Sequence, residues 1–217
     1  MQKLSKLEKE IEADVKIQLH SLLSEMSALA VLSQVFPSPR VKKALYTLRE
    51  TQSTLIDLEH NLIGKQKTLL DAVAYLFWVE VSTNLLADIT IIMFATKGQP
   101  FHIEPDDRYR FIRHVASIED LESPSVTLAV KLDFLDKSGF SCFNKYVDRT
   151  LRNKIAHMDF EIDEKGNFSI HEKKNGEIRK KQVDIHQKLN RLTFFNSVFM
   201  HEIKLSVDKA KKKVKSM

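Results

Sequence analysis

The sequence predicts an all-α fold, a helical bundle with one small β-hairpin. Apolar residues recur at spacings of three and four along most of the chain, which is the pattern of helices with one buried face. The 217 residues include only 5 Gly and 5 Pro, whereas a turn-rich β architecture needs a turn every ~8–12 residues. Hydrophobic content of 43% and charged content of 29% are ordinary for a soluble globular protein.

The first predicted unit, residues 1–64, is an antiparallel helical hairpin. Its first helix ends before Pro37 and Pro39, and Gly64 closes its second helix. The apolar positions that define the two helices are Leu4, Leu7, Ile11, Val15, Leu19, Leu22, Met26 and Leu29, then Val41, Leu45, Leu48, Leu55, Leu58 and Leu62. The hairpin is either a dimerisation or partner arm or a pair of helices that packs on the rest of the protein.

The second predicted unit, residues 65–217, begins with the most apolar stretch of the chain. A helix is predicted from Lys65 to about Ala95, and Asp71, Glu80 and Asp88 interrupt its apolar run. No uncharged segment there approaches the ~18 residues of a membrane span. We therefore expect a helix that is buried on most sides, and no membrane association.

Four further helices are predicted in this unit. They cover about 106–121, 126–138, 141–157 and a last segment from about 183 onward. Before the last one, Phe160–Ile162 and Phe168–Ile170 alternate apolar with polar residues on either side of the turn residues Asp163–Asn167. This alternation predicts the β-hairpin, and Asn175-Gly176 marks another turn after it.

The composition excludes several kinds of chemistry. The single cysteine, Cys142, cannot form an intrachain disulfide or a multi-cysteine metal site. The five glycines are isolated, so no phosphate-binding loop of an NTPase is present. Outside the motif described below, the histidines form no His-x-x-x-His pair; they are His20, His60, His102, His114, His171, His186 and His201. We expect neither a metal nor a cofactor.

The compartment is predicted from the cysteine usage and the first residues. A lone cysteine suits a reducing interior. The start of the chain, Met1–Lys6, lacks the apolar core of a secretion signal. We therefore expect a cytoplasmic protein.

Positive charge is unevenly distributed along the chain. The net charge is +5, and lysines and arginines concentrate in the segments 173–181 and 209–215. A basic surface favours polyanions, above all nucleic acid. The alternative for segment 209–215 is a solvated tail without a ligand.

The strongest chemical signal is the block Arg152-Asn153-Lys154-Ile155-Ala156-His157, which closes the predicted helix 141–157. Asn153 and His157 are one turn apart on one face, so the amide can hydrogen-bond the ring and fix its tautomer. Arg152 lies about 140° from His157 around the helix axis, since each residue advances the helix by 100°. A site shared between two copies of this helix would bring an arginine and a histidine together better than one copy does.

These residue types suit phosphodiester chemistry. Histidine at a helix C-terminus can act as a general base or acid near neutral pH. Arginine can hold a phosphate at two points and stabilise the charge that develops on it. The neighbouring Arg149, Lys154 and Lys145 would add positive potential and contact RNA. The alternative is that the cations are ordinary surface charges and that His157 merely ends a helix.

The block, with Leu151 before it, resembles the signature of the HEPN superfamily (higher eukaryotes and prokaryotes nucleotide-binding domains). That signature is Arg, a polar residue, three further residues and His, on a helix of an all-helical bundle. The resemblance covers about ten residues and fits the layout from Lys65 onward, but not the first sixty-odd residues.

The resemblance implies a metal-independent endoribonuclease that uses the substrate's 2′-OH and leaves a 2′,3′-cyclic phosphate, as in toxins, phage defence or RNA processing. His157 would handle the protons, Arg152 the phosphate charge and Asn153 the orientation of the ring. The resemblance also implies RNA as a partner, a homodimer with a shared site, and an antitoxin or another protein partner. A non-catalytic HEPN-like dimer that binds RNA, a nucleotide or a protein is the alternative, and a purely structural helical scaffold is a third hypothesis.

The resemblance also bears on two further positions, Glu80 and Asp159. HEPN domains often carry an acidic residue on an earlier helix that faces the motif, and Glu80 is the candidate here. A salt bridge from Glu80 to Arg152 with a purely structural role is the alternative. Some HEPN toxins have a tyrosine two residues after the histidine, where a partner enzyme modifies it. This chain has Asp159 there, so we expect no such control.

Overall fold

The computed structural model describes most of the chain and confirms the all-α prediction. It describes residues 5–22, 62–96, 126–137, 140–174 and 176–216, together with the short pieces 42–43, 46–47, 49–50, 53–54 and 57–58. The elements are α1 (Lys6–Leu22), α4 (Gly64–Thr96), α5 (Leu128–Lys137), α6 (Ser141–Tyr146), α7 (Arg149–Ala156), β1 (Phe160–Ile162), β2 (Phe168–Lys174), β3 (Glu177–Gln182) and α8 (Ile185–Lys215). The predicted helix at 106–121 lies outside the described residues.

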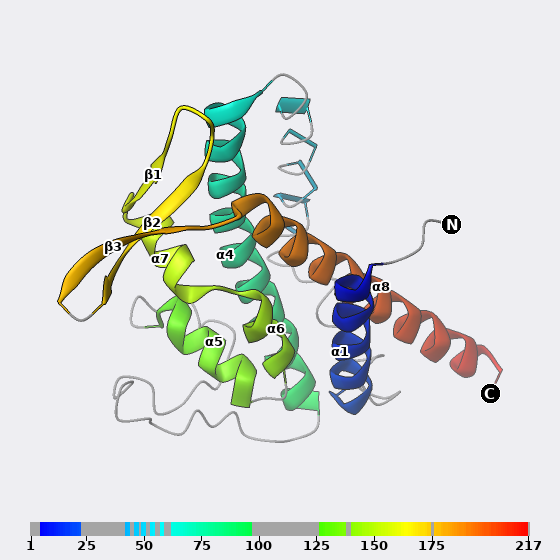
Figure 1. Cartoon of the computed structure of the whole chain (residues 1–217). Helices are drawn as coiled ribbons and strands as arrows, with labels where there is room; N and C mark the ends of the chain where they lie inside the picture. The colour runs from blue at the N-terminus through cyan, green and yellow to red at the C-terminus, as the bar shows by residue number, and fades with distance from the viewer. Residues whose placement is uncertain are drawn as a thin grey trace.

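The two long helices α4 and α8 form the frame of the bundle (Figure 1). Residues such as Ala72, Tyr75, Val79 and Leu86 on α4 are buried, which agrees with the prediction of a helix covered on most sides. Within the described part of the chain, the segment Gly64–Thr90 is long and apolar enough to cross a membrane by length and composition. In the structure, 56% of its most apolar window is buried inside the protein, as in a core helix.

Helix α1 packs on α8 instead of projecting from the body. Ile11, Val15 and Leu19 recur at spacings of four, are all buried, and belong to the same hydrophobic core as α4 and α8. Gln18 also connects α1 to α6 by a hydrogen bond, in which its Nε2 donates to Ser141 Oγ at 2.7 Å. Helix α1 therefore packs on the rest of the protein, which is one of the two alternatives given above for the predicted hairpin. Most of the second predicted helix lies outside the described residues, so the hairpin and the boundary after residue 64 remain predictions.

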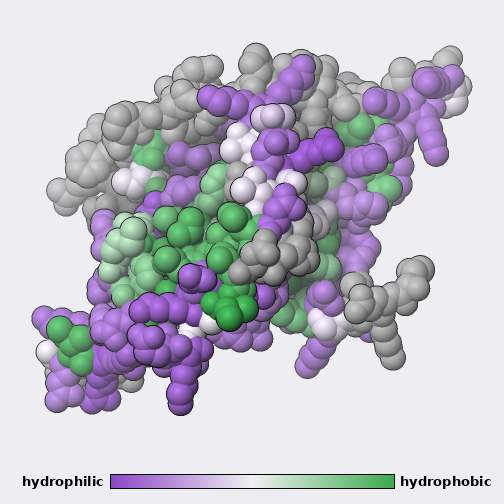
Figure 2. All heavy atoms as spheres, turned by 90° about the horizontal axis from the view of Figure 1, so that it is seen from above, coloured by the Kyte–Doolittle hydropathy of each residue, from purple (hydrophilic) through white to green (hydrophobic). Residues whose placement is uncertain are grey.

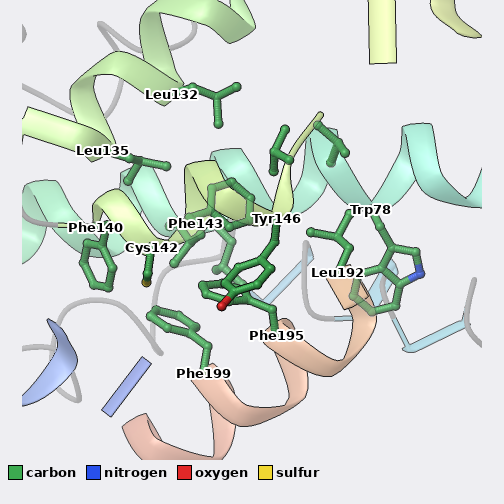
Figure 3. Packing of buried hydrophobic residues seen from close by; sticks show 14 of the residues in the cluster. Trp78, Leu132, Leu135, Phe140, Cys142, Phe143, Tyr146, Leu192, Phe195 and Phe199 are labelled. Carbon is green, nitrogen blue, oxygen red and sulfur yellow. The ribbon is translucent and has the colours of Figure 1, made fainter. Parts of the chain in front are cut away.

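An aromatic cluster joins α6 to α8 at the centre of the core (Figure 3). Phe143 lies 5.2 Å from Phe195 between ring centroids, and Phe140 lies 5.7 Å from Phe199 in an edge-on arrangement. Both α8 rings, Phe195 and Phe199, are buried in the core. Cys142 is buried in the same cluster.

The region after the motif forms a three-stranded antiparallel sheet in the order β1-β2-β3, one strand more than the predicted hairpin. Phe160 pairs with Ile170 between β1 and β2, as the alternation indicated. The third strand follows the second turn, where Gly176 has a φ of +85°, a conformation that glycine adopts without strain. The ribbon of β2 and β3 projects from the bundle (Figure 1).

The single helix predicted over 141–157 is two helices, and this prediction was wrong. Val147 is extended, with φ −99° and ψ 113°, and α7 starts anew after Asp148. The Asp148 carboxylate accepts the Leu151 backbone N–H at 3.0 Å, as an N-cap does. The Tyr75 hydroxyl on α4 accepts the Asp148 N–H at 2.8 Å. These two bonds replace the helical hydrogen bonds that a continuous helix would make.

Candidate functional site

Helix α7 carries the motif and is held against the core by its apolar side. Leu151 and Ile155 are buried, whereas Arg152 is partly exposed and Asn153 is exposed on the opposite side. Lys188 of α8 donates to the second carboxylate oxygen of Asp148 at 3.0 Å. Burial alone would raise the pKa of Asp148, but the bonds from Leu151 and Lys188 outweigh it and lower that pKa. The start of the motif helix is therefore fixed by an ionised cap.

Arg152 and Glu80 form the centre of the site. Arg152 Nε donates to Glu80 Oε1 at 2.7 Å, and Nη2 donates to the same oxygen. Nη1 donates to Asn153 Oδ1 at 3.0 Å. The side chains of Arg152 and Glu80 are 22% and 36% exposed, so the pair is reachable from solvent. Glu80 thus faces the motif as expected, and the contact fits both roles that the sequence left open.

His157 ends α7 as its C-cap residue and is exposed. Its backbone N–H still donates to Asn153 O at 3.0 Å. The expected bond from the Asn153 amide to the ring is not formed: among the described residues, none hydrogen-bonds the His157 ring. Instead, Asn153 Oδ1 accepts a hydrogen bond from Arg152 Nη1 at 3.0 Å. Within the described part of the chain, both ring nitrogens of His157 are left for a ligand.

The three cations expected to contact RNA are each neutralised by a carboxylate from another segment or turn. Lys145 Nζ lies 2.8 Å from Asp14 Oδ2, Arg149 Nη2 lies 2.7 Å from Asp133 Oδ1, and Lys154 pairs with Asp159. The positive potential expected from these residues is therefore reduced. Two of the partners, Asp14 and Asp133, are too distant in sequence for spacing to reveal them.

The turn after His157 contains a feature that the sequence does not announce. Met158 has a φ of +56°, which an L-residue with a side chain rarely adopts, and it is 77% exposed. Met158 N–H donates to Ile155 O at 3.0 Å, and Asp159 N–H donates to Lys154 O at 2.8 Å. The Asp159 side chain contacts both Lys154 and His171 of β2. The motif is thus connected directly to the sheet.

One face of α4 beside the site is not covered by the described part of the chain. Leu69, Val73, Phe77 and Glu80 follow one another at helical spacing, and Leu69 and Val73 are 46% and 52% exposed. Leu69 also lines a groove against β1 with Phe160 and Ile162. Figure 2 looks down on the end of the molecule where α4 begins and shows a hydrophobic area in the middle of this surface. The apolar face of α4 leads directly to Glu80.

The described residues contain no group of three or more histidine, cysteine, aspartate or glutamate side chains that could hold a metal ion. A polar cavity of about 490 Å³ lies beside His186 and Asp71, and no motif residue lines it.

Comparisons with protein-family models, with curated proteins and with solved structures found no match to this chain.

Proposed function

We propose that this chain is a metal-independent endoribonuclease of the HEPN type. The observation that carries the proposal is the joint placement of three motif residues. Arg152 is oriented by Glu80 and Asn153, and His157 lies exposed at the end of the same helix. A cytoplasmic toxin, phage-defence or RNA-processing enzyme is the corresponding biological role.

Arg152 retains donors for a phosphate despite its ion pair. A guanidinium has five N–H donors, and the bonds to Glu80 and Asn153 use one each on Nε, Nη1 and Nη2. One N–H remains on each terminal nitrogen. Two such donors suit two-point binding of a phosphodiester, and Glu80 limits the rotation of the side chain before the substrate arrives.

The proposed reaction begins with removal of the proton from a ribose 2′-OH by His157. The 2′-oxygen forms a bond to the adjacent phosphorus, and the bond from phosphorus to the 5′-oxygen breaks. The departing 5′-oxygen takes up a proton from a His157 imidazolium formed in this way, so the products are a 2′,3′-cyclic phosphate and a 5′-OH. Arg152 stabilises the negative charge that develops on the phosphate oxygens.

A homodimer with a shared site is part of the proposal. Arg152 and His157 lie on different sides of α7, so one copy alone does not direct both at a single phosphate. The apolar face of α4 ends at Glu80, and burial of this face against a second copy is energetically favourable.

Val73→Glu should therefore give monomers with little cleavage activity. Leu205→Glu, on a 38% exposed leucine of α8, is the matched control and should leave the dimer intact. Analytical ultracentrifugation distinguishes the two species.

The second candidate is a non-catalytic HEPN-like dimer that binds RNA, a nucleotide or a protein partner such as an antitoxin. The pairing of Lys145, Arg149 and Lys154 with carboxylates leaves little free positive charge around the motif, which favours a protein partner within this alternative. If the ligand is RNA, this alternative predicts salt-sensitive binding without cleavage products.

The deciding experiment incubates the purified protein with labelled RNA in excess EDTA, beside His157→Ala. His201→Ala, on an exposed histidine of α8, is the matched control. We expect cyclic-phosphate ends from the wild type and from His201→Ala, and none from His157→Ala. Full activity of His157→Ala excludes the mechanism. RNA binding without cleavage by the wild type favours the second candidate.

A further inference from the structure

His171 of β2 lies between two carboxylates next to the motif. Its Nδ1 is 3.3 Å from Asp159 Oδ1, and its Nε2 is 3.2 Å from Glu161 Oε1. The ring is 31% exposed, so it is partly screened from water. Both ring nitrogens therefore face an acceptor, which distinguishes His171 from His157.

The two carboxylates are held in their ionised form by lysines from the flanking elements. Lys154 of α7, and secondarily His171, lower the pKa of Asp159. Lys180 of β3, whose Nζ lies 2.6 Å from Glu161 Oε2, lowers the pKa of Glu161. The result is a row of charged and polar side chains in contact from α7 to β3: Lys154, Asp159, His171, Glu161 and Lys180.

The His171 ring bridges the two carboxylates through its two nitrogens. The contact from Nδ1 to Asp159 has hydrogen-bond geometry, and Nε2 lies 3.2 Å from Glu161 Oε1. In the register of the sheet, His171 is directly opposite Lys180, and Glu161 contacts both side chains.

This row of side chains ends on the turn that carries His157. Asp159 lies two residues after His157, and Met158 between them has the unfavourable φ of +56°. Such a conformation persists only where its surroundings hold it. Asp159 is held from α7 by Lys154 and from the sheet by His171. His171 is thus the link between the sheet and the end of the motif helix.

We propose that His171 is a positioning residue: held by Asp159 and Glu161, it fixes the turn 157–159 and thereby the position of the His157 ring. The expected effect on kcat rests on the proposed ribonuclease function. The expected effect on the position of the His157 ring does not. His171 itself does not touch the substrate, because both of its nitrogens are engaged within the protein.

The experiment compares His171→Gln with His186→Gln. Glutamine can donate to one carboxylate but presents an oxygen to the other. His186 is the matched control, since its Nδ1 lies 3.2 Å from Asp71 Oδ2 without contact to the motif turn. We expect His171→Gln to lower kcat for RNA cleavage about tenfold with KM within twofold of the wild type, since loss of alignment is felt mainly in the chemical step. His186→Gln should leave both constants unchanged. Asp159→Asn, which breaks the same link from the motif side, should reproduce the loss in kcat.

Imidazole ¹H–¹⁵N spectra of the same proteins give a readout that does not require activity. The His157 ring signals should move in His171→Gln but not in His186→Gln. An active wild type with unchanged kcat in His171→Gln overturns the positioning role. If the wild type does not cleave RNA, the proposed function fails, and the spectra alone decide whether His171 positions the His157 ring. Unmoved His157 signals in His171→Gln then overturn the positioning role.

Discussion

Arg152 on α7 donates through Nε to Glu80 Oε1 on α4 at 2.7 Å, although the two residues are 72 positions apart in the chain. A second donor of the same guanidinium, Nη2, contacts the same oxygen. The contact ties the motif helix to the central helix of the bundle. It also leaves one N–H on each terminal nitrogen of Arg152 for a ligand.

The first prediction concerns the strength of this pair. Glu80→Gln should lower the free energy of unfolding by about 1 kcal/mol, because a partly exposed charged hydrogen bond is lost. Combined with Arg152→Gln, it should show a positive coupling in a double-mutant cycle measured by urea unfolding. Glu164→Gln, whose side chain is 95% exposed and 3.7 Å from Lys65, is the control and should change little. Additive single effects at residues 80 and 152 would contradict the contact.

The second prediction concerns the cap of α7. Asp148→Ala should destabilise the protein by about 1 kcal/mol, as loss of an N-cap does. Because the pKa of Asp148 is lowered in the folded state, its charge stabilises the protein above the unfolded pKa of about 3.9. That contribution is lost as the pH falls through the folded pKa.

Asp148→Asn separates the charge of the cap from its hydrogen bond, because it keeps an oxygen for Leu151 N–H. Its stability deficit against the wild type should be constant near neutral pH and shrink below about pH 4. Asp136→Ala, on an exposed residue of α5, is the control for both Asp148 variants in thermal unfolding scans at each pH. A deficit of Asp148→Asn that grows on acidification would contradict the assignment.

The third prediction compares two glycines with positive φ. A Cβ at Gly166, where φ is +82°, would lie 3.0 Å from the backbone carbon of Gly64, whereas a Cβ at Gly176, where φ is +85°, would meet nothing within 4 Å. Both alanine variants place a side chain at positive φ, which costs about 1 kcal/mol of folding stability. Gly166→Ala should cost roughly 1 kcal/mol or more beyond Gly176→Ala, because its new methyl group meets backbone. Equal melting temperatures of the two variants would show that the turn at 166 does not pack on Gly64.

The fourth prediction concerns Cys142. Burial raises the pKa of this thiol to about 12, so very little thiolate exists at pH 8. We expect the native protein to resist a thiol–disulfide reagent at pH 8 and to react with it promptly in concentrated guanidinium chloride. Fast reaction of the native protein, at a rate above that of its global unfolding, would contradict the burial of this side chain.

The fifth prediction concerns the source of RNA affinity. Lys209, Lys211, Lys212 and Lys215 of α8 are exposed, and the structure describes no ion pair between any of them and another described residue. Replacing all four with glutamine should reduce the slope of log affinity against log salt concentration by up to about 0.7 per lysine that contacts a phosphate in single-stranded RNA. Lys145→Gln, at a lysine already paired with Asp14, should leave the slope unchanged. A steeper dependence on Lys145 than on the four lysines would contradict this assignment.

Much of the fold follows from local patterns in the sequence. The apolar periodicity predicted both ends of α4 and the start of α8 to within about two residues, since helical periodicity depends only on neighbouring residues. The end of α8 at Lys215 was not predicted. The alternation at Phe160–Ile162 and Phe168–Ile170 predicted the first strand pair, and the structure adds its register. Glu80, which contacts Arg152, was also singled out from the sequence, whereas the roles of Arg152, Asn153 and His157 stay predictions.

The remaining features depend on contacts between distant segments. The break between α6 and α7 needs the Tyr75 hydroxyl from α4 as well as the local cap at Asp148. The cations around the motif are neutralised by carboxylates such as Asp14 and Asp133, which the bundle brings next to them. His171 meets Asp159 and Glu161 only because β1 and β2 pair. The sequence by itself determined which residues are available for chemistry, whereas the tertiary structure decided which charges remain free, because ion pairing depends on the packing of elements and not on their spacing in the chain.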